Sequence, residues 1–269
     1  MRTLPAVAAA FSVLSLSLPL CAQWTEDVIS EFAMSAPRFS GAAPVTGGDS
    51  LSSQKCPESP FEYSVTYPQG FDGGGPVDKA VGAAAERLLA IGRGEGEGFI
   101  SSGAECESPE PAYARVGSLP FRVSSRAYSV LYSWSTYTGG AHANYGYFSQ
   151  NLLADGSELT FQRLFSDSAR SLPLLWEIVY KGYCGRDDNL EAPSFFGSQP
   201  CAPAVPPAPA QLSPEAASLD MAGHALLTSL GVSFHLGPYE AYSFPQGPQF
   251  LDIPKETLLK IGADQEIWR

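Results

Sequence analysis

The part of the sequence best suited to chemistry or recognition is a polar and aromatic turn between two strand-like segments. It consists of Tyr137, Thr138, Gly139, Gly140, Ala141, His142, Ala143 and Asn144. The glycines can adopt positive φ without a steric penalty, as a tight reversal between strands requires. The reversal does not require the polar and aromatic neighbours. The candidate binding residues of this turn are therefore Tyr137, Thr138, Gly139, Gly140, His142 and Asn144.

His142 has two interpretations. An exposed imidazole titrates near neutral pH and can serve as a general base or a recognition group. Alternatively, its ring hydrogen-bonds the turn backbone and fixes the hairpin. We favour the second interpretation because the sequence offers no nucleophile for this histidine. Asn144 has the same two interpretations, since asparagine tolerates left-handed turns and caps backbone groups.

A second candidate segment follows Gly237-Pro238 and contains Tyr239, Glu240 and Tyr242. Aromatic anchors supply much of the energy of protein interfaces, so this segment suits a binding rim. The alternative is that it packs at the edge of the core. The other two histidines, His224 and His235, lie in apolar surroundings, and we expect both to be structural.

The cysteines predict disulfides rather than a metal site. Apart from Cys21 near the N-terminus, the chain contains Cys56, Cys106, Cys184 and Cys201. An even number suits two disulfides in an oxidising compartment, and we prefer Cys56 with Cys106 and Cys184 with Cys201 among the three possible pairings. No pair has the close spacing of a zinc site, and no histidine pair has metal-binding spacing. We expect no metal and no cofactor.

The N-terminus has the form of a secretory signal, with a charged start and a short apolar run over 4–20. Cleavage after Ala22 would leave a mature chain that begins at Gln23. The alternative is a lipoprotein anchored at Cys21, although Leu20 is an unfavourable residue before a lipidated cysteine. The apolar run is too short for a transmembrane helix of about 20 residues. We expect a periplasmic or secreted protein.

The chain is acidic, with a formal charge of -12 over its 269 residues. Loss of residues 1–22 removes one positive charge, that of Arg2, and changes -12 to -13. This charge argues against nucleic acid and anionic membrane surfaces as partners and favours a basic protein or cationic ligand. Solubility is the simpler explanation.

Periodicity predicts an α+β fold with a largely antiparallel sheet, covering helices and stabilising disulfides. Strands are expected at Phe61–Tyr67, Ala112–Val123, Ala127–Tyr137, Tyr145–Leu152, twice within Ala225–Leu236, and at Phe250–Ile253. A first helix should begin at Pro76 and end at Gly92 and Gly94, with a flexible acidic turn over 92–98. Further helices are expected at roughly Leu172–Lys181 and Pro254–Ile261.

We divide the chain into a signal peptide (1–22), an extended or partly ordered segment (23–55), a strand–helix–strand part (56–123) and a C-terminal domain (124–269). The last part includes a Pro-rich insertion over 189–214.

Three motifs occur in order: Tyr-Thr-Gly-Gly-Ala-His at 137–142, Gly-x-x-Leu-Thr-x-x-x-Leu-Phe at 156–165 and Pro-Tyr-Glu at 238–240. Together they resemble the C-terminal domain of RsiV-type anti-sigma factors and the non-catalytic N-terminal part of PdaC-type peptidoglycan deacetylases. The resemblance covers roughly Ser124 to Gly262, and more loosely Phe61 to Arg93. It implies an extracytoplasmic α+β domain, and one branch of the family binds lysozyme as a signal.

The chain departs from that pattern, because it has no sigma-binding segment or transmembrane helix before the domain and no deacetylase domain after it. Anti-sigma activity is therefore not implied. We expect an exported binding domain of a bacterial envelope that recognises a protein or glycan, with lysozyme, another basic protein and peptidoglycan as candidate partners. The alternative is an envelope glycan or ester hydrolase with His142 as general base.

Overall fold

The computed structural model describes residues 29–52, 54, 59–102, 111–139, 142–184, 224–237 and 248–269. Its elements are α2 (Glu31–Ser35), β1 (Ala43–Leu51), β2 (Phe61–Gln69), α3 (Pro76–Ser102), β3 (Ala112–Arg122), β4 (Ala127–Tyr137), β5 (Asn144–Leu153), α4 (Phe161–Leu164), α5 (Ser168–Cys184), β6 (Ala225–Thr228), β7 (Gly231–Leu236), β8 (Gln249–Pro254), α7 (Lys255–Lys260) and the 3-10 helix η5 (Gln265–Trp268).

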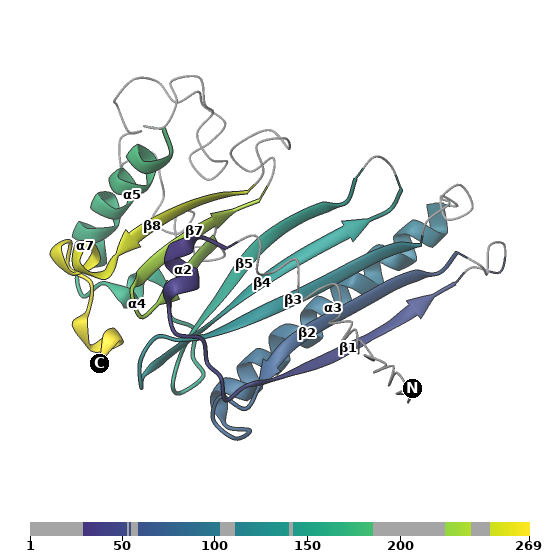
Figure 1. The fold of residues 1–269 in the computed structure, drawn as a ribbon, viewed down its shortest axis with the longest axis horizontal. Helices are drawn as coiled ribbons and strands as arrows, with labels where there is room; N and C mark the ends of the chain where they lie inside the picture. Colours follow the sequence, from purple (N-terminus) through teal and green to yellow (C-terminus); the bar gives the residue numbers. More distant parts are fainter. Residues whose placement is uncertain are drawn as a thin grey trace, which may run out of the picture.

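The strands form two sheets, one of five strands in the order β1-β2-β3-β4-β5 and one of three in the order β6-β7-β8. Figure 1 shows α3 behind the larger sheet, and α5 and α7 beside the smaller one. The α+β class is confirmed, and the expected strands from β2 to β8 are present. The larger sheet contains β3 and β4 from either side of the division that we drew at residue 123.

The larger sheet is mixed rather than uniformly antiparallel. β2 and β3 run parallel, with Phe61 opposite Ala112 and Val65 opposite Val116. A parallel pair needs a crossover connection, and α3 supplies it. The other strand pairs are antiparallel. The sequence pattern did not predict this crossover.

The helix expected to end at Gly92 and Gly94 continues to Ser102. The prediction of a flexible turn over 92–98 was therefore wrong. Two of its glycines face the sheet. A Cβ on Gly92 would lie 3.2 Å from the Tyr63 Cβ, and one on Gly96 would lie 2.6 Å from the Phe61 ring. The missing side chains allow the helix to approach β2 closely, and packing outweighs the low helix propensity of glycine.

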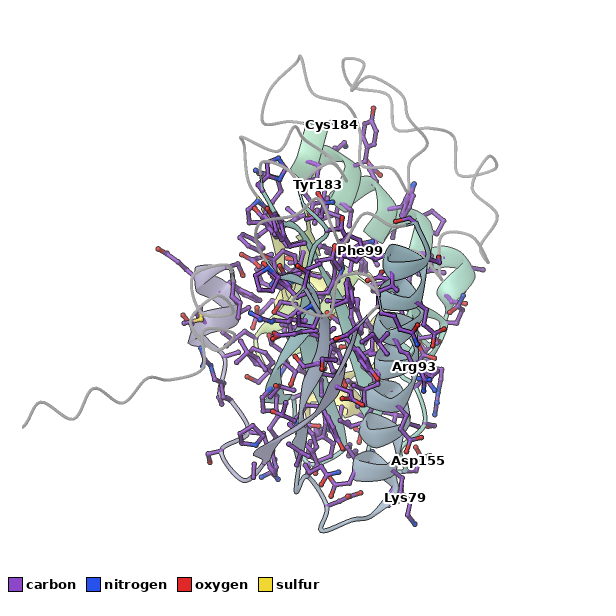
Figure 2. All side chains as sticks on the ribbon, turned by 90° about the vertical axis from the view of Figure 1, so that its right-hand side faces the viewer. Lys79, Arg93, Phe99, Asp155, Tyr183 and Cys184 are labelled. Atoms are coloured by element: carbon purple, nitrogen blue, oxygen red, sulfur yellow. The ribbon has the colours of Figure 1, made fainter. Side chains whose placement is uncertain are left out.

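The start of α3 is fixed by two aspartates. Asp72 Oδ2 accepts a hydrogen bond from the Val77 N–H at 2.8 Å. Asp78 accepts hydrogen bonds from the N–H groups of Gly70, Phe71 and Gly74 at 2.7–3.0 Å. Burial raises the pKa of Asp78, but these three N–H groups outweigh burial and hold it below its ordinary value. Figure 2 shows the helix with Lys79 near its start and Phe99 near its end.

The second expected helix, at roughly Leu172–Lys181, is the longer α5, which contains Pro173. Part of the segment expected to be extended or partly ordered forms α2 and β1, and β1 pairs with β2 along its whole length. The largest core cluster joins α4, α5, α7 and η5 to the smaller sheet. The expected insertion at 189–214 lies outside the described residues.

The two sheets are joined by Asn151, a buried side chain of β5. Its Nδ2 donates to the Ala225 carbonyl of β6 at 2.7 Å, and its Oδ1 accepts from the Leu227 N–H at 2.9 Å. Ser129 Oγ also donates to this Oδ1, at 2.8 Å. The amide therefore satisfies β6 backbone groups that would otherwise lie buried without partners.

Candidate functional site

The β4–β5 turn lies at one end of the larger sheet. Tyr137 ends β4 and Asn144 begins β5, while Gly139 has a φ of 96°, as a tight turn requires. Thr138 and His142 are exposed. The structure thus places Tyr137, Thr138, His142 and Asn144 at this end of the sheet. Gly140, and the second predicted segment with Tyr239, Glu240 and Tyr242, lie outside the described residues.

His142 contacts the backbone of its own turn, with Nδ1 3.2 Å from the carbonyl oxygen of Ala143. This contact fits the interpretation of His142 as a group that fixes the turn.

The sheet face opposite α3 carries the side chains that extend this turn into a surface. Opposed residues of neighbouring strands share a face. Register pairs Tyr113 with Tyr137 and Arg115 with Ser135, and β2 adds Glu62 on the same side. We define the open face as the part of this side that includes Thr46, Glu62, Thr66, Tyr113, Arg115, Ser133, Ser135 and Tyr137. Sequence reasoning missed it, apart from Tyr137.

Arg115 is the central charged group of the open face. Its Nη2 donates to Glu62 Oε2 at 2.8 Å, and its guanidinium carbon lies 4.4 Å from the centroid of the Tyr113 ring. The rings of Tyr113 and Tyr137 are 6.0 Å apart. The Arg115 and Glu62 side chains are 35% and 48% exposed, so a ligand can reach both. The arrangement presents a planar cation, a carboxylate and aromatic rings in one row.

The other end of the same sheet side is covered. Phe121, Leu131 and Tyr147 pack there against α2 and against Leu226 of β6. Figure 1 shows α2 in front of the sheets at this end. The open face therefore begins where this packing stops and continues to the β4–β5 turn.

Buried serine and histidine side chains and the partly buried Asp252 form a group beneath α2. Ser30 and Ser233 both donate to Asp252 Oδ1, at 2.8 and 2.5 Å. His235 does not complete a catalytic triad, because its Nδ1 faces the Ser233 carbonyl rather than a hydroxyl. Burial lowers the pKa of His235 to about 4, so the ring is neutral at physiological pH. The arrangement joins α2 to the smaller sheet and offers no activated nucleophile.

Cys184 ends α5 and is disulfide-bonded. Its partner and the other expected disulfide cysteines, Cys56, Cys106 and Cys201, lie outside the described residues, so the predicted pairing stays a prediction. Figure 2 labels Cys184 beside Tyr183 at the end of this helix. Among the residues that the structure describes, no group of three or more His, Cys, Asp or Glu side chains could hold a metal ion. The helices in this part of the chain include none with the length and apolar character needed to cross a membrane.

No family model matches the sequence, and no curated protein gives a significant match. Solved structures do resemble the fold. A DUF3298 family protein from Pseudomonas aeruginosa PAO1 is 13% identical, with 84% of this chain and 96% of that chain covered and a TM-score of 0.52. A DUF3298 family member from Bacteroides fragilis NCTC 9343 is 12% identical, with 86% and 98% covered and a TM-score of 0.53.

DUF3298 is a domain family related to the RsiV- and PdaC-type extracytoplasmic domains. At these identities the likeness concerns the fold and not the activity or ligand. The chain shares its α+β architecture with DUF3298 family structures.

Proposed function

We propose that the protein is an exported binding domain of a bacterial envelope, which recognises a protein or glycan ligand at the open face and the adjoining β4–β5 turn. The row formed by Glu62, Arg115, Tyr113 and Tyr137 is the observation that carries this proposal. Tyrosine and arginine are enriched among the residues that dominate binding energy. The ion pair and the ring contact hold Arg115 in place, which reduces the entropy that a ligand must remove.

A lysozyme is the first protein ligand to test. The chain carries a formal charge of -12, which complements a basic enzyme and would accelerate their encounter at low salt. The resemblance of the 137–142 motif to RsiV-type domains also supports this choice. Soluble peptidoglycan fragments are the corresponding glycan ligand.

The hydrolase alternative is not carried forward. A general base at position 142 would need a group that orients its imidazole and a substrate atom that it activates. The sequence offers no nucleophile for this histidine, and its Nδ1 contact with the Ala143 carbonyl supports the turn interpretation.

The test is calorimetric titration of the protein with lysozyme, and separately with peptidoglycan fragments, at physiological salt. We expect one of them to bind, and Tyr113→Ala and Arg115→Ala each to weaken that binding by roughly 10- to 100-fold. Arg93→Ala is the matched control, because Arg93 forms a similar exposed ion pair with Glu97 on α3, 2.9 Å long. Absence of binding to both ligands, or affinities that both open-face variants leave unchanged, would reject the proposal.

Export has a separate test. Intact-mass measurement on protein purified from the envelope distinguishes a chain that begins at Gln23 from one that carries lipid on Cys21. The same measurement before and after reduction gives the number of disulfides. A mass that retains residues 1–22 would contradict export by signal cleavage.

A further inference from the structure

A cavity of about 280 Å³ lies between α3 and the larger sheet, on the opposite side of the sheet from the open face. Its wall on the helix side includes Leu88, Ile91 and Gly92, and its floor includes Trp134 and Phe148. It is partly open to solvent. Protein interiors contain few voids larger than a water molecule, so a space of this size between two packed layers requires an explanation.

Clusters of packed side chains seat α3 on the larger sheet on either side of the cavity. Near its start, Val77 and Val81 belong to one buried cluster with Val130 and Tyr132 of β4 and Leu152 of β5. Near its end, Phe99 packs on Phe61, with ring centroids 5.7 Å apart. Between these clusters Gly92 lets the helix approach β2, since an added Cβ would lie 3.2 Å from the Tyr63 Cβ. The cavity lies beside this close contact, over Trp134 and Phe148.

The floor of the cavity is held rigidly. An ideal Cβ on Gly146 would lie 2.7 Å from three atoms of the Trp134 indole, so the indole rests directly on the β5 backbone. Phe148 stacks on Tyr132 with ring centroids 4.7 Å apart and an interplanar angle of 10°. These contacts hold both rings in place, so they cannot collapse inward to close the space.

The lining identifies the kind of molecule that fits. Its side chains are predominantly aliphatic and aromatic, as in pockets for small ligands. A cavity of roughly 150 Å³ suffices for benzene, so this one has room for an alkyl chain on the order of eight carbons. Ile91 at the edge is 59% exposed, which leaves an apolar surface at the entrance.

The charge at the entrance selects the head group. Glu95 is exposed and also lines the cavity. It forms no ion pair with any residue in the described ranges, whereas Arg115, the other charged lining residue, is held by Glu62 on the far side of the sheet. Partial burial raises the pKa of Glu95, in keeping with its place beside an apolar space. An anionic head would be repelled here, whereas a neutral or cationic head would be accepted.

We infer that the cavity between α3 and the larger sheet is a binding site for a single-chain amphiphile whose head group is not anionic. This site is independent of the proposed recognition function, since it lies on the other side of the sheet.

The test uses three probes with the same chain and different heads: octanol, octylamine and octanoate. Calorimetric titration below their aggregation concentrations should show saturable 1:1 binding of octanol and octylamine, with octanoate at least tenfold weaker. Val116 also lines the cavity, so Val116→Phe places a ring in it and should weaken octanol binding at least tenfold. Absence of saturable octanol binding to the unmodified protein would overturn the inference.

Glu95→Lys provides a second variant that does not disturb the core. It should leave octanol affinity unchanged and reverse the order of octylamine and octanoate. Glu97→Lys is the matched control, because Glu97 lies on the same helix but does not line the cavity, and it should preserve the original order. Tyr113→Ala on the open face should leave octanol binding unchanged. If Glu95→Lys still binds octylamine more tightly than octanoate, the assignment of Glu95 to the cavity entrance is rejected.

Discussion

The two sheets differ in what covers them. All residues of β6 and β7 are buried, because α5 and α7 pack on one side of the smaller sheet and α2, β4 and β5 on the other. In the larger sheet, α3 covers one side while the open face stays partly accessible. The smaller sheet is therefore a structural core, and the larger sheet combines a core side with a surface suited to recognition.

The largest effect on stability should come from a substitution that creates a cavity in the core of the smaller sheet. Phe234 is fully buried and stacks on Phe161 with ring centroids 6.0 Å apart. Phe234→Ala should reduce the free energy of unfolding by about 3–5 kcal/mol, measured by urea denaturation. Tyr113→Ala on the open face is the comparison, and it should cost less than about 1 kcal/mol. Equal losses in the two variants would mean that the sheets do not differ as described.

The connection between the sheets gives the next effect. Asn151→Ala leaves the Ala225 carbonyl and the Leu227 N–H without the side-chain partners that they have in the native protein. Each unsatisfied buried group costs about 1–3 kcal/mol, so we expect a loss of about 3 kcal/mol in the same denaturation experiment. In the Asn151→Ala protein, hydrogen exchange should show that the amides of β6 lose more protection, relative to the unmodified protein, than those of β3. Unchanged protection of β6 would show that this link does not hold the smaller sheet in place.

Acid should weaken the smaller sheet through His235. Its folded pKa is about 4, below the ordinary 6.5, because burial disfavours the charged ring. Between those values the unfolded state binds a proton that the native state does not, so stability falls as pH decreases from about 6.5 to 4. At roughly 1.4 kcal/mol per unit, the loss approaches about 3 kcal/mol.

Denaturation curves across this pH range test this expectation. His235→Phe should flatten this part of the dependence. A His235→Phe protein that loses stability with the same slope would contradict the assignment.

The smallest effect compares two glycines of the same helix. Gly96→Ala places a methyl group 2.6 Å from the Phe61 ring, and Phe61 is fully buried, so we expect a net loss of about 1–2 kcal/mol. A Cβ on Gly94 meets open space, so Gly94→Ala should stabilise the protein by about 0.5–1 kcal/mol. Melting temperatures that shift in the same direction would show that α3 does not depend on close approach at Gly96.

The strands could be predicted because their side chains alternate in character. β4 places Val130, Tyr132 and Trp134 toward α3, and in the sequence these residues alternate with Ser129, Leu131 and Ser133. The end of α3 could not be predicted, because glycine lowers helix propensity locally, whereas the compensating contacts come from β2. The parallel pairing of β2 and β3 depends on the path of that same helix.

The candidate site was predictable only where its residues are neighbours in the chain. The turn from Tyr137 to Asn144 could be identified because its glycines and its polar and aromatic residues are adjacent in the sequence. The open face did not, because Glu62 and Arg115 are 53 positions apart and meet only through strand register. Asp252 could not be identified as a partner of Ser30 by any local pattern.

The contact between α2 and the smaller sheet also affects the order in which parts of the chain fold. Ser30 precedes Ser233 by 203 positions and Asp252 by 222. Synthesis proceeds from the N-terminus, so the strands that receive this helix emerge well after it. The first described helix must therefore be among the last to reach its final place. Such long-range closure slows folding and leaves the apolar side of α2 accessible to holding chaperones until β7 and β8 have formed.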